Sequence, residues 1–475
     1  MNIADFAASA VRKIGKHTGK KLAKSVGAPE IPKSEPIRMK NPTDEFYNLG
    51  FAKREVMPDD IETGTYWLAG YRTGNKVVGV LDPLTVSAIW LDCKDNGGII
   101  FVSADCVGLT GFEVDLVRAS LADFSKKTGC VNISISCTHT HASIDTVGYW
   151  GKLPKTGKSQ KYMEKFLDAI KQVCMEAYEN KKEGRLFIGS KHVPECIEDR
   201  REPIVCNDRL TRLRFVPNDG SEETWFLNYG AHPNCLGGAN SKVSADYPYF
   251  LRERINKEKK TNVLFSVNAI LGVDIAPLCE DRYERTKLGG EKLAEAAMSI
   301  DNDEQLAPEI TVLNQPYYAP IDNGVLALMA IIHVCNSKKY ACDKGDLGMA
   351  LKTEMDFFKL GKLNILTLPG EAASEFVYGG YSSAETSATG KGPEINPPCL
   401  VDIVGDKDLL VMGVSNDMTG YMVPPNDFIL HETQPYLSTA KDRFDRRHYH
   451  ETNSLGYLTP FVVADVLKDM VERLK

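Results

Sequence analysis

The chain has 475 residues, of which 43% are hydrophobic and 25% are charged, values typical of a globular protein that buries a large core. Its formal net charge of −7 argues against a nucleic-acid-binding protein, which would be basic. No segment approaches the roughly 20 apolar residues of a membrane span, and the start of the chain lacks the apolar core of a secretory signal peptide. We therefore expect a cytoplasmic protein with reduced cysteines.

Residues 1–40 differ in composition from the rest of the chain. Apolar residues recur at helical spacing, among them Ile3, Phe6, Ala10 and Ile14, and positive charge follows from Arg12 to Lys24. Residues 27–36 contain three prolines. We predict a basic amphipathic helix and a linker. Peripheral contact with a membrane surface is one interpretation, and a solvated tail or a helix docked on the body is the other. Residues 41–475 are expected to form one domain.

Strands and helices alternate in this second part. Short apolar or alternating segments predict strands at 98–104, 131–137, 210–215, 224–229, 262–268, 363–368 and 409–414. Amphipathic segments predict helices at 112–127, at 162–178 and from about residue 461. Such alternation predicts an α/β fold with a mixed β-sheet core flanked by helices.

Two histidines follow the strand predicted at 131–137. Because side chains alternate along a strand, His139 and His141 are expected on one face, together with the apolar side chains of that strand. Neutral imidazole is a common zinc ligand, and its second nitrogen needs an orienting partner. A lone His-x-His pair fits a structural pair equally well, so the pattern alone leaves both interpretations open.

Metal-capable or polar residues also follow five other predicted strands. In chain order these residues are Asp105, His232, Asp274, Glu371 and Tyr421. Sites in open α/β sheets collect at the carboxyl ends of strands for geometric reasons. The sequence therefore indicates a metal site at strand ends, to which several loops contribute.

Four of these segments resemble motifs of the neutral/alkaline, non-lysosomal ceramidases. Cys-Thr-His-Thr-His at 137–141 resembles that family's Thr-His-Thr-His-Ser-Gly motif, and Gly-Ala-His-Pro at 230–233 resembles its second histidine motif. Leu-Pro-Gly-Glu at 368–371 resembles its Pro-Gly-Glu motif, and Ser-Asn-Asp-Met-Thr-Gly-Tyr at 415–421 resembles its Asn-x-Tyr-x-x-Tyr segment. The motifs occur in the family's order, from about residue 50 onward, so the chain resembles the catalytic domain of that family.

The resemblance implies a cofactor and roles for matching residues. Zn²⁺ would be held by His139, His232, Glu371 and Tyr421. A zinc site with two histidines and a carboxylate leaves a position open for water. His141 matches a second histidine beside the metal. The residues expected to act in catalysis are His141, Asp274 and Tyr421.

The substrate-binding residues are less sharply defined by the resemblance. Arg200 or Arg201 is expected to line the substrate site, and the alignment leaves open which. Asp105 is expected either to bind substrate or to orient a histidine, and a purely structural role is the alternative. Tyr71 is a candidate for the pocket wall or the core. His17, His192, His333, His431, His448 and His450 are interpreted as structural or surface residues.

Three departures from the family bear on the substrate. Ala276 stands where the family's Gly-Asp-Val-Ser-Pro motif has serine, and residues 142–145 (Ala-Ser-Ile-Asp) replace a glycine-rich stretch. The chain ends soon after the last motif, so the family's C-terminal β-sandwich domain is expected to be absent. The resemblance implies a zinc hydrolase that cleaves an N-acyl amide bond in a sphingolipid or other lipid-like substrate. The alternatives are a zinc hydrolase of a different amide or ester, and a catalytically silent homologue that binds a lipid or a partner.

Overall fold

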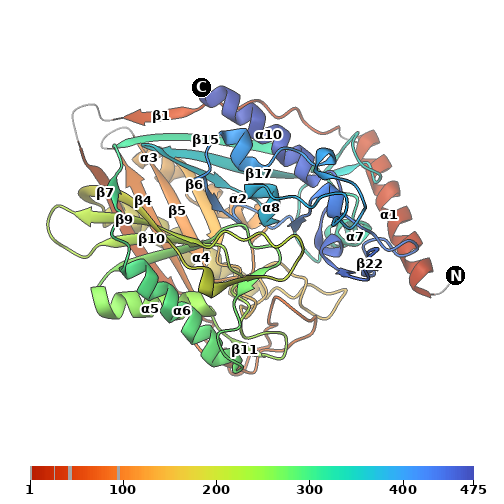
Figure 1. Cartoon of the computed structure of the whole chain (residues 1–475), viewed down its shortest axis with the longest axis horizontal. Coiled ribbons are helices and arrows are strands. Elements are labelled where there is room, and N and C mark those ends of the chain that lie inside the picture. Colours follow the sequence, from red (N-terminus) through yellow and green to blue (C-terminus); the bar gives the residue numbers. More distant parts are fainter. Residues whose placement is uncertain (1–2, 26, 41–44, 94–96) are drawn as a thin grey trace.

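The computed structural model describes residues 3–25, 27–40, 45–93 and 97–475, and the domain boundary predicted at residue 41 lies outside them. Within the described residues, two β-sheets lie face to face and helices cover their outer faces (Figure 1). The mixed α/β class predicted from the alternation of segments is confirmed.

The larger sheet has nine strands within the described part of the chain, in the order β12-β10-β9-β7-β2-β4-β5-β6, with β14 beside β7. Most neighbours are antiparallel, but β5–β6 and β10–β12 are parallel. The strands are β2 (Tyr47–Glu55), β4 (Thr85–Asp92), β5 (Gly98–Ala104), β6 (Cys130–Cys137), β7 (Lys182–His192), β9 (Arg209–Pro217), β10 (Thr224–Tyr229), β12 (Asn262–Val267) and β14 (Glu304–Gln305).

The smaller sheet has six strands among the described residues, in the order β1-β15-β17-β18-β20, with β16 beside β17. Its strands are β1 (Ile37–Lys40), β15 (Glu309–Pro320), β16 (Lys339–Ala341), β17 (Met349–Leu360), β18 (Leu363–Thr367) and β20 (Leu410–Met412). An apolar core fills the space between the sheets. Phe101 of β5 packs in this core on Phe226 of β10 and Phe358 of β17, with ring centroids 5.8 and 4.9 Å away.

Helices complete a four-layer arrangement (Figure 1). The larger sheet carries α2 (Gly111–Ser120), α3 (Ala122–Thr128), α4 (Gln160–Glu179), α5 (Tyr247–Lys259) and α6 (Arg282–Met298). The smaller sheet carries α7 (Gly324–Ile331), α8 (Ser374–Tyr378), α9 (Leu400–Val404) and α10 (Thr459–Leu474). Short two-stranded sheets also connect some of the loops. One of them pairs β19 (Glu371–Ala372) with β21 (Tyr421–Met422) at the site described below.

The two sheets meet where β6, β12 and β20 end. Gly413, after β20, donates its N–H to the carbonyl of Val267 at 2.9 Å, and Cys137 donates to Val414 at 3.0 Å. The Asp356 carboxylate is fully buried beneath this junction and accepts hydrogen bonds from the side-chain amides of Asn132, Asn314 and Asn416 at 2.9, 2.7 and 2.6 Å. The loops that follow these strands are thus held close together.

The N-terminal segment lies on the body of the protein. Helix α1 (Ile3–Ser25) packs against α7, β16 and β17. The proline-containing stretch after it is extended and follows β15, where the Tyr318 hydroxyl donates to Pro29 O at 2.8 Å and Ser34 N donates to Gln315 Oε1 at 3.1 Å. Of this segment, Met1, Asn2, Val26 and the side chains of Ile3, Ala4 and Ser25 lie outside the description. None of the described helices is both long and apolar enough to cross a membrane.

Candidate metal centre

The two histidines of the first motif converge, but not by strand alternation as predicted. Strand β6 ends at Cys137, and His139 has a φ of 63°, so the backbone leaves the extended conformation before the histidines are reached. His139 N–H donates to Cys106 O and His141 N–H donates to Pro233 O, each at 2.9 Å. This turn aims both imidazoles at one point, with ring centroids 4.9 Å apart.

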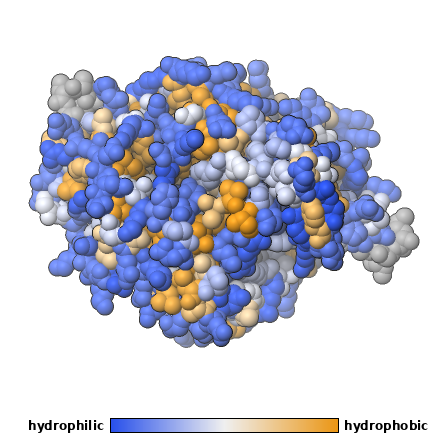
Figure 2. Space-filling view, in the orientation of Figure 1, coloured by the Kyte–Doolittle hydropathy of each residue, from blue (hydrophilic) through white to orange (hydrophobic). Residues whose placement is uncertain are grey.

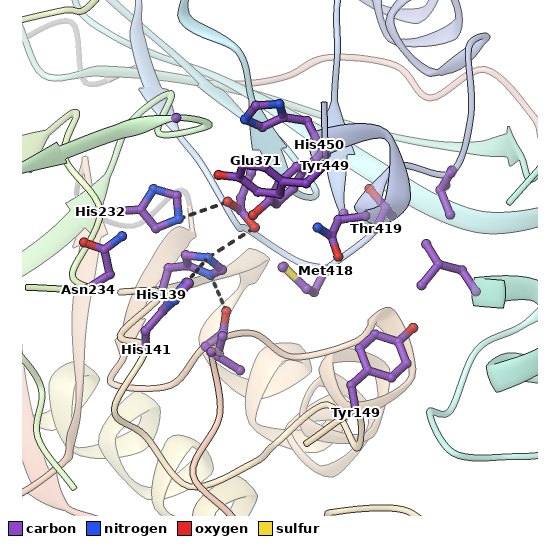
Figure 3. Close-up of a pocket in the computed structure, with 18 of the residues that line it drawn as sticks. His139, His141, Tyr149, His232, Asn234, Glu371, Met418, Thr419, Tyr449 and His450 are labelled. Atoms are coloured by element: carbon purple, nitrogen blue, oxygen red, sulfur yellow. Dashed lines mark hydrogen bonds and ion pairs between the residues drawn. The ribbon is translucent and has the colours of Figure 1, made fainter. Parts of the chain in front are cut away.

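Three imidazoles and a carboxylate face one another at that point (Figure 3). The Nε2 atoms of His139 and His141 are 3.1 Å apart. The two carboxylate oxygens of Glu371 lie 3.2 Å from His139 Nε2 and 3.0 Å from His232 Nε2. Glu371 begins β19, and His232 follows β10. His139, His232 and Glu371 are buried, so the cluster lies in a medium of low dielectric.

The outer ring nitrogens of two histidines determine the state of the inner ones. His139 Nδ1 lies 2.5 Å from Val107 O, and His232 Nδ1 lies 2.7 Å from Ile270 O. A carbonyl oxygen only accepts, so each Nδ1 must carry a proton, and in a neutral ring Nε2 then has a bare lone pair. The Nε2 atoms of His139 and His232 both face the Glu371 carboxylate, and His139 Nε2 also faces His141 Nε2.

Such a set of electron-rich atoms can hold a cation between them. Glu371 Oε2 is buried, and it has no hydrogen-bond donor among the described residues while the His232 ring is neutral. Burial alone would raise the pKa of Glu371, but His139 and His232 outweigh it and hold this pKa well below its usual range. Burial likewise opposes the charged form of His232, yet the Glu371 carboxylate raises the pKa of this imidazole. Imidazole and carboxylate donors at this spacing suit a divalent metal such as zinc, so the residues fit the ion that the resemblance implies.

His141 is the histidine nearest to the open cavity. Its Nε2 belongs to the group of three imidazole nitrogens of His139, His141 and His232 that lie within 4.8 Å of one another. Its Nδ1 is buried without a hydrogen-bond partner among the described residues. Burial and the two neighbouring imidazoles lower the pKa of His141, which favours its neutral form. The geometry therefore allows His141 to be a ligand or a neutral acid–base group.

Tyr421 stands next to the carboxylate of this cluster. It pairs with Glu371 in the short parallel ladder of β19 and β21, and its side chain lines the cavity. Burial and the Glu371 charge raise the pKa of its hydroxyl. The phenol is therefore protonated unless a nearby cation offsets both effects, which makes it a hydrogen-bond donor or a weak metal ligand.

The two arginines occupy different environments. Arg201 is 7% exposed and is held between the carboxylates of Glu375 and Asp427. Arg200 is 55% exposed, and its Nε lies 2.6 Å from Asp274 Oδ2. Both line the cavity, but of the two only the guanidinium of Arg200 is exposed enough to meet a ligand while it stays paired with Asp274. Asp274 itself also accepts from Asn234 Nδ2 at 2.8 Å.

Asp105 does not contact the cavity, so its placement among substrate-binding residues was wrong. It is fully buried and forms a two-point ion pair with Arg252 at 3.0 and 2.8 Å. It also accepts from the backbone and hydroxyl of Thr85, and from the Thr138 hydroxyl at 3.2 Å. A buried carboxylate needs such partners. Asp105 thus anchors the turn beside His139 and is structural.

The cluster lies at one end of a cavity of about 800 Å³. We call this part the histidine end. Away from the histidines, Tyr149, Trp150 and Ala330 belong to one apolar cluster that defines the far end of the cavity, and Leu326 and Leu351 add apolar lining. In Figure 3, Tyr149 lies well away from the histidines, with Met418 between them. An elongated substrate therefore fits with one part at the donor cluster and another against apolar walls.

Several residues that line the cavity were not assigned to it from the sequence, and Tyr71 was left between the pocket wall and the core. Tyr71 is 44% exposed and packs edge-on against His141 at 5.0 Å, so it lines the cavity and not the core. His448 and His450 also line the cavity, as does Tyr449, whose ring lies 4.1 Å from that of His450. They belong to no motif, and only the fold of the C-terminal loops brings them to the cavity.

The sites of departure from the family also have defined positions. Ala276 is half-buried, donates its N–H to Cys196 O at 3.1 Å and is not among the residues that line the cavity. Residues 142–145 are buried, and Asp145 accepts hydrogen bonds from the N–H groups of Val147, Gly148 and Trp150 at 3.0, 2.6 and 2.8 Å. Asp145 thereby shapes the loop that presents Tyr149 and Trp150 to the far end.

Comparisons with known proteins agree with the motif resemblance at the level of the fold. No family model and no curated protein matches the chain by sequence. Among solved structures, the neutral ceramidase from Pseudomonas aeruginosa matches with a TM-score of 0.68 and 16% identity, over 91% of this chain and 75% of that one. A ceramidase complexed with C2 matches with the same TM-score and coverage at 15% identity. The molecule is thus a mixed α/β protein with a buried histidine cluster at strand ends. Its fold is that of the neutral ceramidases, and the resemblance predicted from the four motifs is confirmed.

Proposed function

We propose that this protein is a zinc-dependent hydrolase that cleaves an N-acyl amide bond in a lipid-like substrate. The observation that carries the proposal is the convergence of the three Nε2 atoms and the Glu371 carboxylate at one end of the cavity. A buried set of bare donor atoms is costly unless a cation binds it. The likeness to neutral ceramidases supports the choice of an amide as the bond that is cleaved.

The proposed ligands are His139, His232, Glu371 and Tyr421. Zinc bound there would act as a Lewis acid toward the substrate carbonyl and would lower the pKa of a coordinated water. The carbonyls of Val107 and Ile270 keep the Nδ1 protons of the two histidines in place, and so direct both Nε2 atoms inward. This pre-orientation comes from the backbone, which does not need to rearrange when the substrate binds.

Other residues of the chain move protons and orient the substrate. The neutral form of His141 is favoured and the residue borders the cavity, so its ring can take up a proton from the attacking water and pass it to the leaving amine. The Tyr421 hydroxyl donates a hydrogen bond toward the carbonyl oxygen if it is not a ligand. Asp274 fixes Arg200 and Asn234 at the cavity edge, where the Arg200 guanidinium can donate to polar groups of the substrate headgroup.

The far end of the cavity supports a substrate with an apolar chain. Its walls come from Tyr149 and Trp150 and from α7, and an acyl chain placed there would leave water. The loop that presents the two aromatic residues is the one in which residues 142–145 depart from the family motif. This observation favours an N-acyl amide other than ceramide as the preferred substrate, with an ester as the second candidate.

A substrate panel with a metal-depleted control tests the proposal. We expect the purified protein to hydrolyse N-acyl amides and to lose this activity on treatment with a chelator, and added zinc should restore it. Ceramide, other long-chain N-acyl amides and matched esters should be compared at equal chain length. Absence of hydrolysis across the panel by protein that does contain zinc would contradict the proposal and favour a silent, lipid-binding homologue.

A further inference from the structure

Helix α1 is attached to the body through small residues. Ala8, Gly15 and Gly19 lie on its buried face. A Cβ added at Gly19 would come within 2.0 Å of Leu347 O, and one at Gly15 within 3.0 Å of the Leu347 side chain. The helix backbone therefore lies directly on the segment before β17, and the interface has no room to turn the helix about its axis.

The opposite face of α1 combines exposed apolar side chains with lysines. Phe6 is 68% exposed and Ile14 is 43% exposed. Lysines 13, 20 and 24 follow Phe6 at helical spacing, and Lys21 follows Ile14 two turns later. All four lysines are exposed, and none makes an ion pair with any residue that the structure describes.

This arrangement differs from that of an ordinary solvated helix. Among the described side chains of α1, Asp5 is the only acidic one, and it accepts a hydrogen bond from Gln434 at 2.8 Å at the edge of the docked face. The docked face approaches the body most closely at Gly15 and Gly19, and the larger Val11 and Leu22 pack beside them. Two other large apolar side chains are not part of this face. Phe6 and Ile14 are consequently left facing outward among the lysines.

We propose that the outward face of α1, formed by Phe6, Lys13, Ile14, Lys20, Lys21 and Lys24, docks on an anionic lipid surface. Helices that lie in a membrane interface place apolar side chains at the level of the acyl chains and lysines at the headgroups. Each lysine gains from the negative potential of such a surface. The occupant is therefore a lipid surface with negative charge and not a neutral one.

The position of α1 relative to the cavity gives the docking a consequence. Helix α7 separates the two, since α1 packs against α7 while Leu326 and Ala330 of α7 line the far end of the cavity. A Cβ added at Gly324 would lie 3.0 Å from Val11 of α1. Docking would thus leave α1 and α7 between the lipid and the apolar end of the cavity. The inference stands without the proposed hydrolase activity, because it concerns binding alone.

The face of the molecule that Figure 2 shows is mostly hydrophilic, with apolar side chains in separate patches. Substitution of particular residues is therefore needed to show which surface binds lipid. The test variant is K13E/K20E/K24E in the full chain. The matched control is K126E/K257E/K259E, which removes the same charge from exposed lysines on α3 and α5. Neither variant changes the docked face of α1, and circular dichroism with thermal unfolding should show both to be folded.

The readout is co-sedimentation with vesicles of phosphatidylcholine alone or mixed with phosphatidylserine. We expect the wild-type chain and the control to bind only the anionic vesicles, more weakly at high salt, and the test variant to bind at least about tenfold less. F6S/I14S should also weaken binding, because the apolar contact is lost.

Three results would overturn the proposal. The first is wild-type binding to neither kind of vesicle, or to both equally. The second is an equal loss of vesicle binding in the test and control variants, since the change in net charge alone would then explain the loss. The third is binding of wild type to a polyanion such as heparin but not to anionic vesicles, which would assign the face to an acidic macromolecule.

Discussion

The two ends of the cavity are constructed in different ways. At the histidine end, His139, His232 and Glu371 follow or begin strands, and backbone carbonyls fix the two rings. At the far end, the walls come from the loop around Trp150 and from the short helix α7. Rigid strand ends hold the groups that need exact placement, whereas loops and a short helix form the surface that selects a substrate. Substitutions at the histidine end should abolish catalysis, and substitutions at the far end should change which substrate is hydrolysed.

The largest effect is expected for Glu371→Gln. The amide has the shape of the carboxylate but not its charge, so the two imidazoles would lose the anion that balances a bound cation. Turnover should fall by more than about 10³-fold, with loss of zinc. The control is Glu202→Gln, at an exposed position of the cavity wall, and it should keep both the turnover and the zinc content of the wild type. Steady-state kinetics with metal analysis checks this, and an active Glu371→Gln enzyme would remove Glu371 from the chemistry.

A smaller and selective effect is expected for Trp150→Ala. Loss of the indole enlarges the far end and removes apolar contact with an acyl chain. KM for long-chain N-acyl amides should rise about tenfold or more, while kcat and the kinetics of short-chain substrates stay close to wild type. Tyr340→Ala, an aromatic residue outside the cavity, should change neither. An equal loss on short and long chains would mean that the far end does not hold the chain.

The loop that carries His448 allows a stability test. Burial opposes the charged form of His448, but Glu451, Asp427 and Asp442 outweigh it and raise its pKa. The protonated ring therefore stabilises the folded state fully below the ordinary histidine pKa of about 6.5, and this contribution is lost as pH rises through the raised value. Urea unfolding should show a larger deficit of His448→Gln relative to wild type at acidic than at alkaline pH. A deficit that is constant or grows with pH would contradict the ion pairs.

The smallest effect is expected for Ala276→Ser. Ala276 lies outside the cavity lining, so a hydroxyl there has no direct path to the substrate. Ceramide hydrolysis should change by less than about tenfold, well below the roughly 10²–10³-fold of one catalytic hydrogen bond. Kinetics with ceramide as substrate checks this. A gain of about a hundredfold would show that the pocket still matches the family and that the alanine limits it.

Much of the fold was accessible from local patterns. The strands predicted at 98–104 and 224–229 agree with β5 and β10 residue for residue. The helix predicted at 112–127 is divided at Leu121 into α2 and α3. The long strands β15 and β17 were not predicted, because polar residues and Pro316 interrupt the alternation in β15 and charged residues interrupt it in β17. In β17 one of these, Asp356, is buried only because three asparagine amides from other segments satisfy it, and no local pattern reveals such partners.

The candidate site was likewise predictable from the sequence only in part. The residues in motifs after strands, such as His139 and Glu371, were identified from the sequence, since strand ends and residue types are local properties. Tyr71 was left between the pocket wall and the core, and His450 was interpreted as structural, because both reach the site through loops whose course depends on tertiary contacts. The buried ion pair of Asp105 with Arg252 was also inaccessible, since its partner lies 147 residues away.

Metal content is the most direct test of the account. Elemental analysis of the purified wild-type chain should find about one zinc ion per chain. His139→Ala and His232→Ala should each lose it, whereas His333→Ala, an exposed histidine outside the cavity, should retain it. Zinc lost in the first two variants and kept in the third would establish that the converging imidazoles hold the ion. Full retention of metal by both His139→Ala and His232→Ala would contradict the central claim.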